Sequence, residues 1–390
     1  MFAFLELLFI LAPAYLIRFK LGPLPLNLLE IACAGFIITF PIWLARNSQI
    51  ADFIKFIRTR SRYFLILFGL FFLAAIVSTI ISPSHQRAVG LFIAFFFEPM
   101  LIYFPAAYLL QDPAKKQSLI KLILILISLF SLYAIFQYFT LFHVPPQYWG
   151  NNVEPKRALS VFEYPNAYAL WLAPLLAFSL AFIDDNEIGS KWLRYSALVL
   201  GVLGLLVSES RGGWVGFFVA LIIFVLLSKN KKLKAGLGIG FICAIIIIIC
   251  VPVFRYRVIL PFKGDKSTVS RFSYSTTARK MIKDSPILGK GLYGFASNFN
   301  KYNTDPNLGA VNYPHQIFFN FWVETGLLGM VSFVLLNLWL AAVGYKKRAL
   351  RYSLGLLLFI IAMWVHGLAD APYFLNDLAL VFWIVAALGV

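Results

Sequence analysis

The chain has 390 residues, of which 61% are hydrophobic and only 13% are charged, and its formal net charge is +17. A soluble domain carries roughly 25% charged residues, so this composition excludes a chain of two or three soluble globular domains. In a soluble protein the positive charge would suggest nucleic acid, but here the basic residues flank apolar runs, as they do on the cytoplasmic side of membrane proteins. We therefore expect an integral membrane protein without a nucleic-acid partner.

Apolar runs long enough to cross a hydrocarbon core of roughly 30 Å recur along the whole chain. The first run, residues 2–17, has no basic n-region and no small-residue cleavage site, so we interpret it as a retained span and not as a signal peptide. The predicted fold is an all-α polytopic membrane helix bundle of about twelve transmembrane helices, a single integral membrane domain over residues 1–390. The predicted spans are residues 2–17, 26–45, 63–82, 89–110, 118–141, 167–183, 193–208, 212–228, 235–253, 315–343, 352–369 and 374–390.

Basic residues are distributed unequally between alternate connections of these spans. With a cytoplasmic N-terminus, the cytoplasmic connections hold seventeen Lys and Arg residues and the short external connections hold six. This bias predicts that both termini are cytoplasmic. The cytoplasmic set is Arg46, Lys55, Arg58, Arg60, Arg62, Lys115, Lys116, Lys191, Arg194, Lys229, Lys231, Lys232, Lys234, Lys346, Lys347, Arg348 and Arg351. The external set is Arg18, Lys20, Arg87, Lys156, Arg157 and Arg211.

Two predicted external segments are long enough to carry a function. Residues 143–166 are rich in Pro, Asn and Trp, and residues 254–314 form the long extracytoplasmic loop between the ninth and tenth spans. Within this loop, residues 270–283 are predicted to form a short helix, and Pro286 and the following glycines then favour turns. The three cysteines all lie inside apolar runs and predict neither a disulfide nor a metal site: Cys33, Cys243 and Cys250.

Polar residues next to spans are the candidates for chemistry, because polar groups in a bilayer are costly. Residues 208–213, Ser-Glu-Ser-Arg-Gly-Gly, form a tight external hairpin. Its Arg211 is either a charge at headgroup level or a ligand for a lipid-borne phosphate, which planar guanidinium donors suit. Further on, Asn312 and Pro314 predict the start of a helix, with His315 in its first turn. The helix dipole disfavours the imidazolium there, so His315 is a candidate general base as well as a candidate structural histidine.

Two further pairs of residues lie on the predicted external side. Arg271 and Arg279 are eight residues apart and could share a face of the short helix, or could simply be solvated. His366 and Asp370 are spaced i, i+4 on the eleventh span and could bind a substrate, orient another side chain or pack the bundle. The first external connection lacks a carboxylate, and the paired acids Asp184 and Asp185 lie in a cytoplasmic loop. No metal site and no cofactor are therefore predicted.

In this order and membrane placement, the motifs resemble those of the O-antigen ligase and polymerase superfamily. The resemblance covers roughly residues 160–372. It comprises Pro165 and Asn166, the hairpin at 208–213, Ser270 and Arg271, Pro286 with Gly289, Lys290 and Gly291, the run containing His315, Phe319, Glu324, Gly326, Leu327 and Gly329, and the stretch from His366 to Pro372.

The resemblance implies a metal-independent, inverting glycosyltransferase in the bacterial cytoplasmic (inner) membrane, with an extracytoplasmic active site. Its donor would be a glycan linked to undecaprenyl diphosphate, and its acceptor either the lipid A core, as in ligases, or a second lipid-linked glycan, as in polymerases. Arg211 and Arg271 would hold the diphosphate and His315 would activate the acceptor hydroxyl. We expect the remaining candidates to support the site: Glu209, Arg279, Glu324, His366 and Asp370.

A lipid flippase or other secondary transporter is the alternative from a different class, since about twelve spans would suit it too. Transporters place ionisable groups and broken helices near the bilayer midplane, often in two related halves. Here the polar clusters gather at the predicted external face, and the halves show no evident symmetry. These features favour the enzyme.

Overall fold

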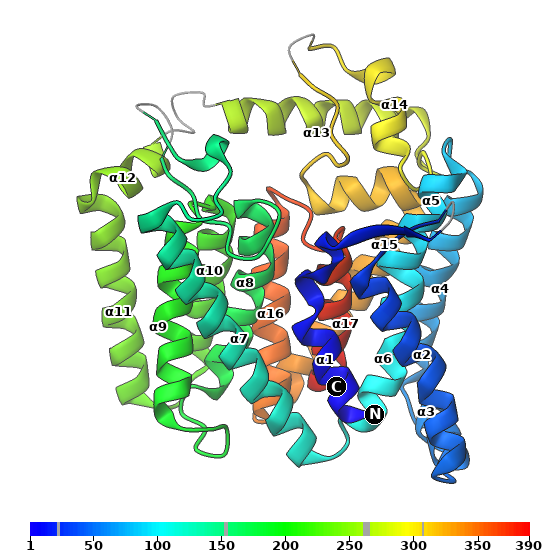
Figure 1. Ribbon diagram of the computed structural model, residues 1–390, viewed down its shortest axis with the longest axis horizontal. Coiled ribbons are helices and arrows are strands. Elements are labelled where there is room, and N and C mark those ends of the chain that lie inside the picture. The colour runs from blue at the N-terminus through cyan, green and yellow to red at the C-terminus, as the bar shows by residue number, and fades with distance from the viewer. Residues whose placement is uncertain (22–23, 152–154, 260–265, 306–307) are drawn as a thin grey trace. The chain divides into compact units, whose positions relative to one another are not determined.

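The computed structural model describes residues 1–21, 24–151, 155–259, 266–305 and 308–390. Helices dominate this part of the chain (Figure 1). The strands it contains form one short antiparallel pair, β1 (Arg18–Leu21) and β2 (Leu24–Asn27), in which Arg18 lies opposite Asn27. Seven helical segments are long and apolar enough to cross a membrane. The predicted all-α polytopic helix bundle is confirmed, while the number of about twelve spans stays a prediction.

Five of the seven segments are single helices: α2 (Leu28–Arg46), α4 (Arg62–Ile80), α7 (Pro113–Thr140), α11 (Lys231–Cys250) and α15 (Ile317–Lys346). The sixth is the continuous run of α5 (His85–Phe92), the π-helical η2 (Ile93–Phe97) and α6 (Glu98–Leu109). The seventh is α8 (Pro165–Ser179) with η4 (Leu180–Phe182). Other predicted spans coincide with α9 (Lys191–Val207), α10 (Arg211–Leu227), α16 (Arg351–Gly367) and α17 (Asn376–Gly389). The span predicted at 2–17 is interrupted: α1 (Phe2–Ile10) gives way to the 3₁₀-helix η1 (Ala12–Leu16) at Pro13, which lacks the N–H needed to continue an α-helix.

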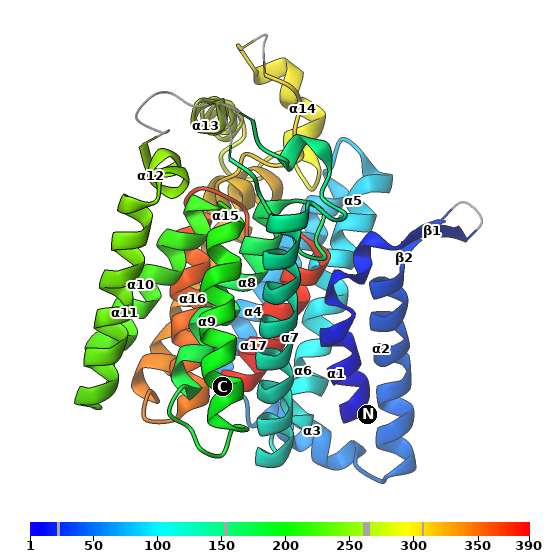
Figure 2. The same cartoon turned by 60° about the vertical axis from the view of Figure 1, so that its left-hand side comes forward.

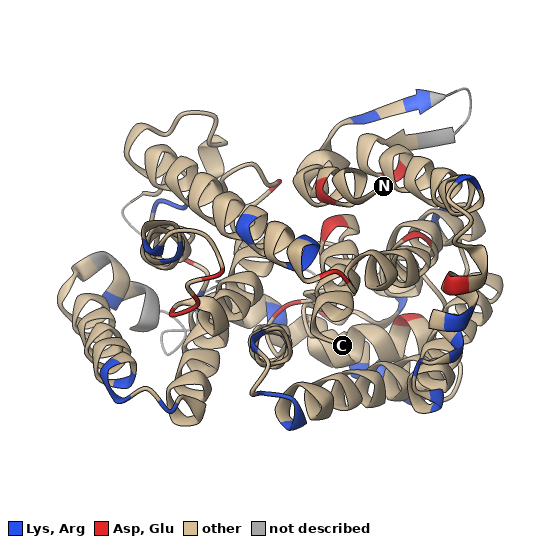
Figure 3. Ribbon diagram, turned by 90° about the horizontal axis from the view of Figure 1, so that it is seen from below, with Lys and Arg blue, Asp and Glu red and all other residues tan. Residues whose placement is uncertain are grey.

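Large apolar side chains on these helices point outward, as a membrane protein requires. Ile38 on α2, Ile66 on α4, Phe139 on α7 and Leu226 on α10 are each more than half exposed. Many Lys and Arg residues lie instead on turns and helix ends, drawn in blue in Figure 3. This separation of apolar sides from charged ends matches a bundle that is surrounded by hydrocarbon.

The chain divides into two compact units, the first comprising Met1–Lys116, Ser270–Lys347 and Gly367–Val390. In this unit α4 packs on α15, and α6 packs on both α17 and α2. Its core holds an aromatic cluster in which Phe321 stacks on Phe333 with ring centroids 3.9 Å apart, and Phe71 and Tyr373 adjoin both. Both chain termini lie toward one end of this unit and α14 (Gly294–Tyr302) toward the other (Figures 1 and 2).

The second unit comprises Gln117–Val269 and Arg348–His366. Here α8 packs against both α9 and α10, and 94% of the 18 residues of α8 and η4 are buried. Helix α11 contacts α10 and leads into α12 (Pro252–Ile259). Only 6% of an apolar stretch of 18 residues in α11 is buried. The unit therefore has a tightly packed centre at α8 and a loosely held outer helix at α11.

The segment predicted as a long loop at 254–314 contains α12, α13 (Lys266–Asp284) and α14. The short helix predicted at 270–283 is confirmed within α13, which begins four residues earlier. The other predicted external segment, 143–166, holds the 3₁₀-turn η3 (Pro146–Tyr148) and ends where α8 begins. Another short helix, α3 (Ile50–Arg58), joins α2 to α4.

Helix α15 is kinked at Gly326, whose φ of 67° and ψ of −173° are not helical. An added Cβ atom at this position would collide with the backbone of Ile287 and Leu288. The amide of Leu327 donates a hydrogen bond of 2.9 Å to the carbonyl of Ile287 across the kink. The E-x-G-L part of the motif therefore requires glycine, both for its left-handed φ and for the close approach of a second chain segment.

That second segment is the turn after α13, which carries the Gly-Lys-Gly motif. Gly289 has a φ of 71° and lies against the carbonyl groups of Trp322 and Val323. The amide of Lys290 donates to the Val323 carbonyl over 2.7 Å, and the amide of Leu292 donates to the Ser78 carbonyl on α4 over 3.0 Å. Residues 286–292 and 322–327, which we call the interlock, thus join two distant motifs into one structural element.

We expect the substitution Gly326→Ala to lower the melting temperature of the detergent-solubilised protein by several degrees. A left-handed non-glycine residue costs on the order of 1–3 kcal/mol, and the collision with Ile287 adds to this cost. Differential scanning fluorimetry would measure the effect. Gly238→Ala on α11 is the control, since a Cβ there meets nothing within 4 Å and should leave the melting temperature unchanged or raise it. Equal melting temperatures for the two variants would contradict this account.

Candidate functional site

His315 lies directly before α15 and not in its first turn, so the predicted helix start is wrong by a few residues. The cap is Gln316, whose side chain accepts a 2.6 Å hydrogen bond from the amide of Phe319. His315 itself has a φ of 51°, a left-handed conformation that an α-helix does not accommodate. Strained non-glycine residues of this kind cluster at active sites and ligand clamps, although this chain also holds them elsewhere, for example at Ser48 and Leu141.

The imidazole of His315 is hydrogen-bonded to Asp370. His315 Nδ1 lies 3.0 Å from Asp370 Oδ1, and the amide of Ala371 donates to the same oxygen over 3.0 Å. The Asp370 side chain is 6% exposed and the His315 side chain 29%. An ionised carboxylate only accepts hydrogen bonds, so this contact places the proton of a neutral imidazole on Nδ1. Nε2 is then the nitrogen that can accept a proton.

The i, i+4 spacing predicts that His366 and Asp370 share a helix face, and this prediction is wrong. Helix α16 ends at Gly367, before it reaches Asp370. Asp370 lies in the turn that follows, and this turn is fixed by Tyr373. The Tyr373 hydroxyl is fully buried, donates to the carbonyl of Phe95 over 2.8 Å and accepts from the indole of Trp383 over 3.0 Å. The aromatic core of the first unit thereby sets the position of the carboxylate.

Two residues of α13 adjoin the His315–Asp370 pair. A guanidinium nitrogen of Arg271 lies 3.7 Å from Asp370 Oδ2, and the Arg271 side chain is 26% exposed. The ring of Tyr274 lies 5.8 Å from the His315 ring, and its hydroxyl donates to the carbonyl of Gly309 over 3.2 Å. Burial raises the pKa of Tyr274, which keeps the phenol neutral and able to donate. Tyr274 is not among the candidates predicted from the sequence, although it lies three residues after Arg271 on the predicted helix.

Arg279, also on α13, has different neighbours. Its guanidinium lies 5.9 Å from the ring centroid of Phe272 and 5.8 Å from that of Phe319 on α15, both within cation–π range. Eight helical residues turn the chain by about 800°, which leaves Arg271 and Arg279 about 80° apart. Arg271 therefore meets Asp370, while Arg279 packs α13 onto α15.

Glu324 lies below the start of α14. Its carboxylate is 1% exposed and accepts hydrogen bonds from the amide of Phe295, over 2.9 Å, and from the amide of Tyr293. Backbone amides at a helix N-terminus are natural partners of a carboxylate. Glu324 accordingly anchors α14 to the kinked α15, next to the interlock.

The hairpin at 208–213 belongs to the second unit. Ser208, Glu209 and Ser210 are buried, Glu209 with a left-handed φ of 54°, and α10 begins at Arg211. A guanidinium nitrogen of Arg211 donates to the hydroxyl of Thr268 at the start of α13 over 3.4 Å. The hairpin thus holds Arg211 at the first turn of α10, an apolar helix of 17 residues.

Arg157 contacts this hairpin. The sequence predicts it only as one of the external basic residues. Its Nε donates to the Ser208 carbonyl over 3.1 Å, and its guanidinium donates to the side chain of Asn166 over 2.6 Å. Asn166 belongs to the Pro-Asn motif at the start of α8. The motifs at 165–166 and 208–213 therefore meet through Arg157.

His366 faces the same hairpin. The side chain is 1% exposed, and a Cβ added to Gly212 would lie 2.6 Å from His366 Cδ2. The glycine after Arg211 thus leaves the space that His366 fills. Among the described residues, no group of three or more His, Cys, Asp or Glu side chains is placed to hold a metal ion.

Comparisons with known proteins agree with the motifs. Residues 196–334 match the protein family described as O-antigen ligase. An uncharacterised protein of Haemophilus influenzae is 27% identical to this chain over an alignment of 185 positions, which covers 42% of this chain and 46% of that protein. The alignment therefore spans about half the length of the relative. The matched residues include Arg211, Arg271, His315 and Glu324, and the match supports the resemblance of this part of the chain to the O-antigen ligase superfamily.

Proposed function

We propose that this protein is a membrane glycosyltransferase that moves a glycan from undecaprenyl diphosphate to an acceptor hydroxyl on the extracytoplasmic face of the bacterial inner membrane. The observation that carries the proposal is the hydrogen bond between His315 and Asp370, with Arg271 beside it. A base oriented by a carboxylate is the arrangement needed to activate a hydroxyl, which is a weak nucleophile by itself.

In the proposed reaction, Nε2 of His315 accepts the proton of the acceptor hydroxyl while its oxygen attacks the anomeric carbon. The bond between that carbon and the diphosphate oxygen breaks, and the diphosphate leaves with the electron pair. Arg271 and, by the family resemblance, Arg211 stabilise the negative charge that develops on the leaving group. A single displacement of this kind inverts the anomeric configuration and needs no metal ion.

The proposed acceptor is the lipid A core, which would make the protein an O-antigen ligase. The alternative within the same superfamily is a polymerase, whose acceptor is a second lipid-linked glycan. Both use the same donor and the same proposed base, so the acceptor alone separates them.

We expect His315→Ala to reduce glycan transfer by about 10²–10⁴-fold, because a general base contributes a factor of this size. Transfer would be measured in proteoliposomes with an undecaprenyl-diphosphate oligosaccharide, offering either lipid A core or a second lipid-linked glycan. Activity of the wild type should survive EDTA, and the productive acceptor would distinguish ligase from polymerase. A variant as active as wild type, in vesicles across which lipid moves, would indicate a transporter instead.

Asp370→Asn should lower kcat by about 10²–10⁴-fold and leave the KM for the donor nearly unchanged. The amide can donate as well as accept, so it no longer fixes the imidazole proton on Nδ1, and loss of an orienting carboxylate has effects of this size elsewhere. Steady-state kinetics would measure both constants. Asp112→Asn, the same change at an exposed acid of the same unit, should match wild type. A rise in KM with unchanged kcat for Asp370→Asn would contradict the positioning role.

Arg271→Ala and Arg211→Ala should each reduce kcat/KM for the donor by about 10²-fold or more, since each removes a charge that stabilises the leaving diphosphate. Arg→Lys at either position should retain part of the activity, because the charge remains but the forked donor geometry does not. Lys283→Ala, which removes an exposed charge from the same helix as Arg271, is the control. If all three alanine variants lose activity equally, the effect reflects the overall positive charge and not diphosphate binding.

A further inference from the structure

An apolar groove of about 600 Å³ lies inside the second unit, between α9, α10 and α11. Each helix contributes large apolar side chains, among them Val199 and Val202, Phe218 and Leu221, and Leu237 and Phe241. Helix α11 contacts α10 directly (Figures 1 and 2). The groove exists because the first half of α11 carries glycines, of which Gly236 and Gly240 line it and have nothing within 4 Å of an added Cβ.

One end of the groove is basic. Lys232 and Asn230 line this end, and three further lysines lie in the same short segment, at positions 229, 231 and 234. The Asn230 side chain is engaged, since it accepts hydrogen bonds from the amides of Lys232 and Leu233 over 3.1 and 3.2 Å. Lys232 is the basic side chain among the residues that line the groove, and it is exposed.

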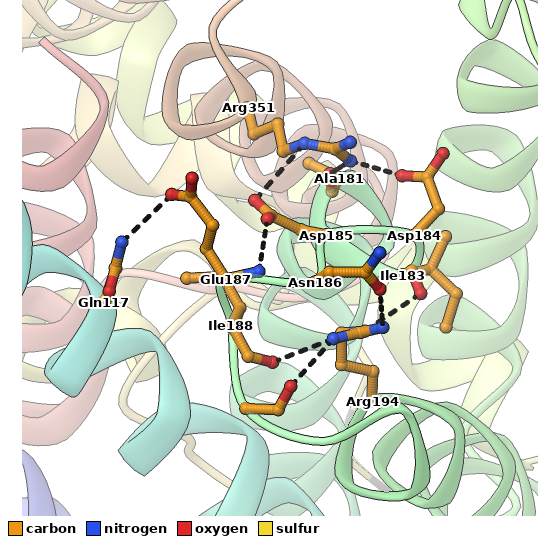
Figure 4. A network of polar contacts seen from close by, with 11 residues as sticks. Gln117, Ala181, Ile183, Asp184, Asp185, Asn186, Glu187, Ile188, Arg194 and Arg351 are labelled. Carbon is orange, nitrogen blue, oxygen red and sulfur yellow. Dashed lines mark hydrogen bonds and ion pairs between the residues drawn. The ribbon is translucent and has the colours of Figure 1, made fainter.

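The acidic residue that lines the groove does not cancel this charge. Asp184 pairs with Arg351, which also lies 3.3 Å from Asp185 (Figure 4). The same turn is fixed by Arg194, which is 4% exposed and donates to the carbonyls of Ile183 and Gly189 over 3.2 and 2.9 Å (Figure 4). The carboxylate that lines the groove is thus paired with an arginine, while the basic end of the groove carries the exposed side chain of Lys232.

We propose that this groove binds an anionic diacyl phospholipid, with an acyl chain between α9 and α11 and the phosphate at Lys232. The apolar lining suits a hydrocarbon chain, and a basic pocket between transmembrane helices suits an anionic headgroup. A peptide is a poorer occupant, because its backbone polar groups would have no partners among these apolar side chains. By the charge distribution of the sequence, this end faces the cytoplasm, so the lipid belongs to the inner leaflet. The proposal is independent of the proposed transfer reaction.

The test uses the full chain, purified in detergent and depleted of lipid, with added phosphatidylglycerol or phosphatidylcholine of the same acyl chains. Native mass spectrometry counts bound lipids, and scanning fluorimetry measures the melting temperature. We expect wild type to bind phosphatidylglycerol in preference to phosphatidylcholine and to gain several degrees from it. Gly240→Phe fills the groove and should abolish both effects. Gly238→Phe on the same helix does not line the groove and should retain them.

Lys232→Glu tests the headgroup at an exposed position where folding is not at risk. Its preference for phosphatidylglycerol should fall at least about fivefold, the factor that one basic side chain contributes beside an anionic lipid. The proposal is wrong if Gly240→Phe binds phosphatidylglycerol as wild type does, or if Lys232→Glu keeps the full preference. It is also wrong if Gly240→Phe changes only the oligomer mass, because the groove would then be a contact between copies of the chain.

Discussion

The relative placement of Arg271 and His315 depends on the interlock between the turn at 286–292 and the kinked part of α15. Arg271 lies on α13, whose last residue is Asp284, and His315 lies immediately before α15. The backbone bonds from Lys290 to Val323 and from Leu327 to Ile287 tie the end of one helix to the body of the other. Neither bond could form with a side chain at Gly289 or Gly326. Two glycines in distant motifs thus fix the spacing of a cation and the proposed base.

The second constraint is that His315 and Asp370, unlike Arg271, lie on irregular backbone. His315 has a left-handed φ, and Asp370 lies in a turn between two helices. Each is fixed by a contact with a buried group. His315 is hydrogen-bonded to Asp370, and the turn that carries Asp370 is fixed by the buried hydroxyl of Tyr373 in the aromatic core. Supporting contacts of this kind would keep the proposed base and its carboxylate partner in position without a substrate present.

Hydropathy and charge predicted the helix bundle and the residues that carry polar chemistry, because both depend on composition over short windows. The left-handed φ of His315, the turn at Asp370 and the burial of Glu324 under α14 could not be predicted, since each depends on a partner far away in the sequence. Local signals instead suggested a helical His315, from the capping residues before it, and a shared face for His366 and Asp370, from their i, i+4 spacing. Two features were within reach: the break at Pro13, which follows from its missing N–H, and Tyr274, one turn from Arg271.

Helix α10 connects the two places in the second unit where a phosphate is proposed to bind. It begins at Arg211 and ends at Leu227, two residues before the lysine segment. Its 17 residues span about 26 Å at 1.5 Å per residue, which is close to the thickness of a hydrocarbon core. One phosphate cannot reach both ends, so the lipid proposed at Lys232 differs from the diphosphate donor proposed at Arg211. A lipid in the groove would instead brace α11, the least buried membrane-length helix of this unit, against the helix that carries Arg211.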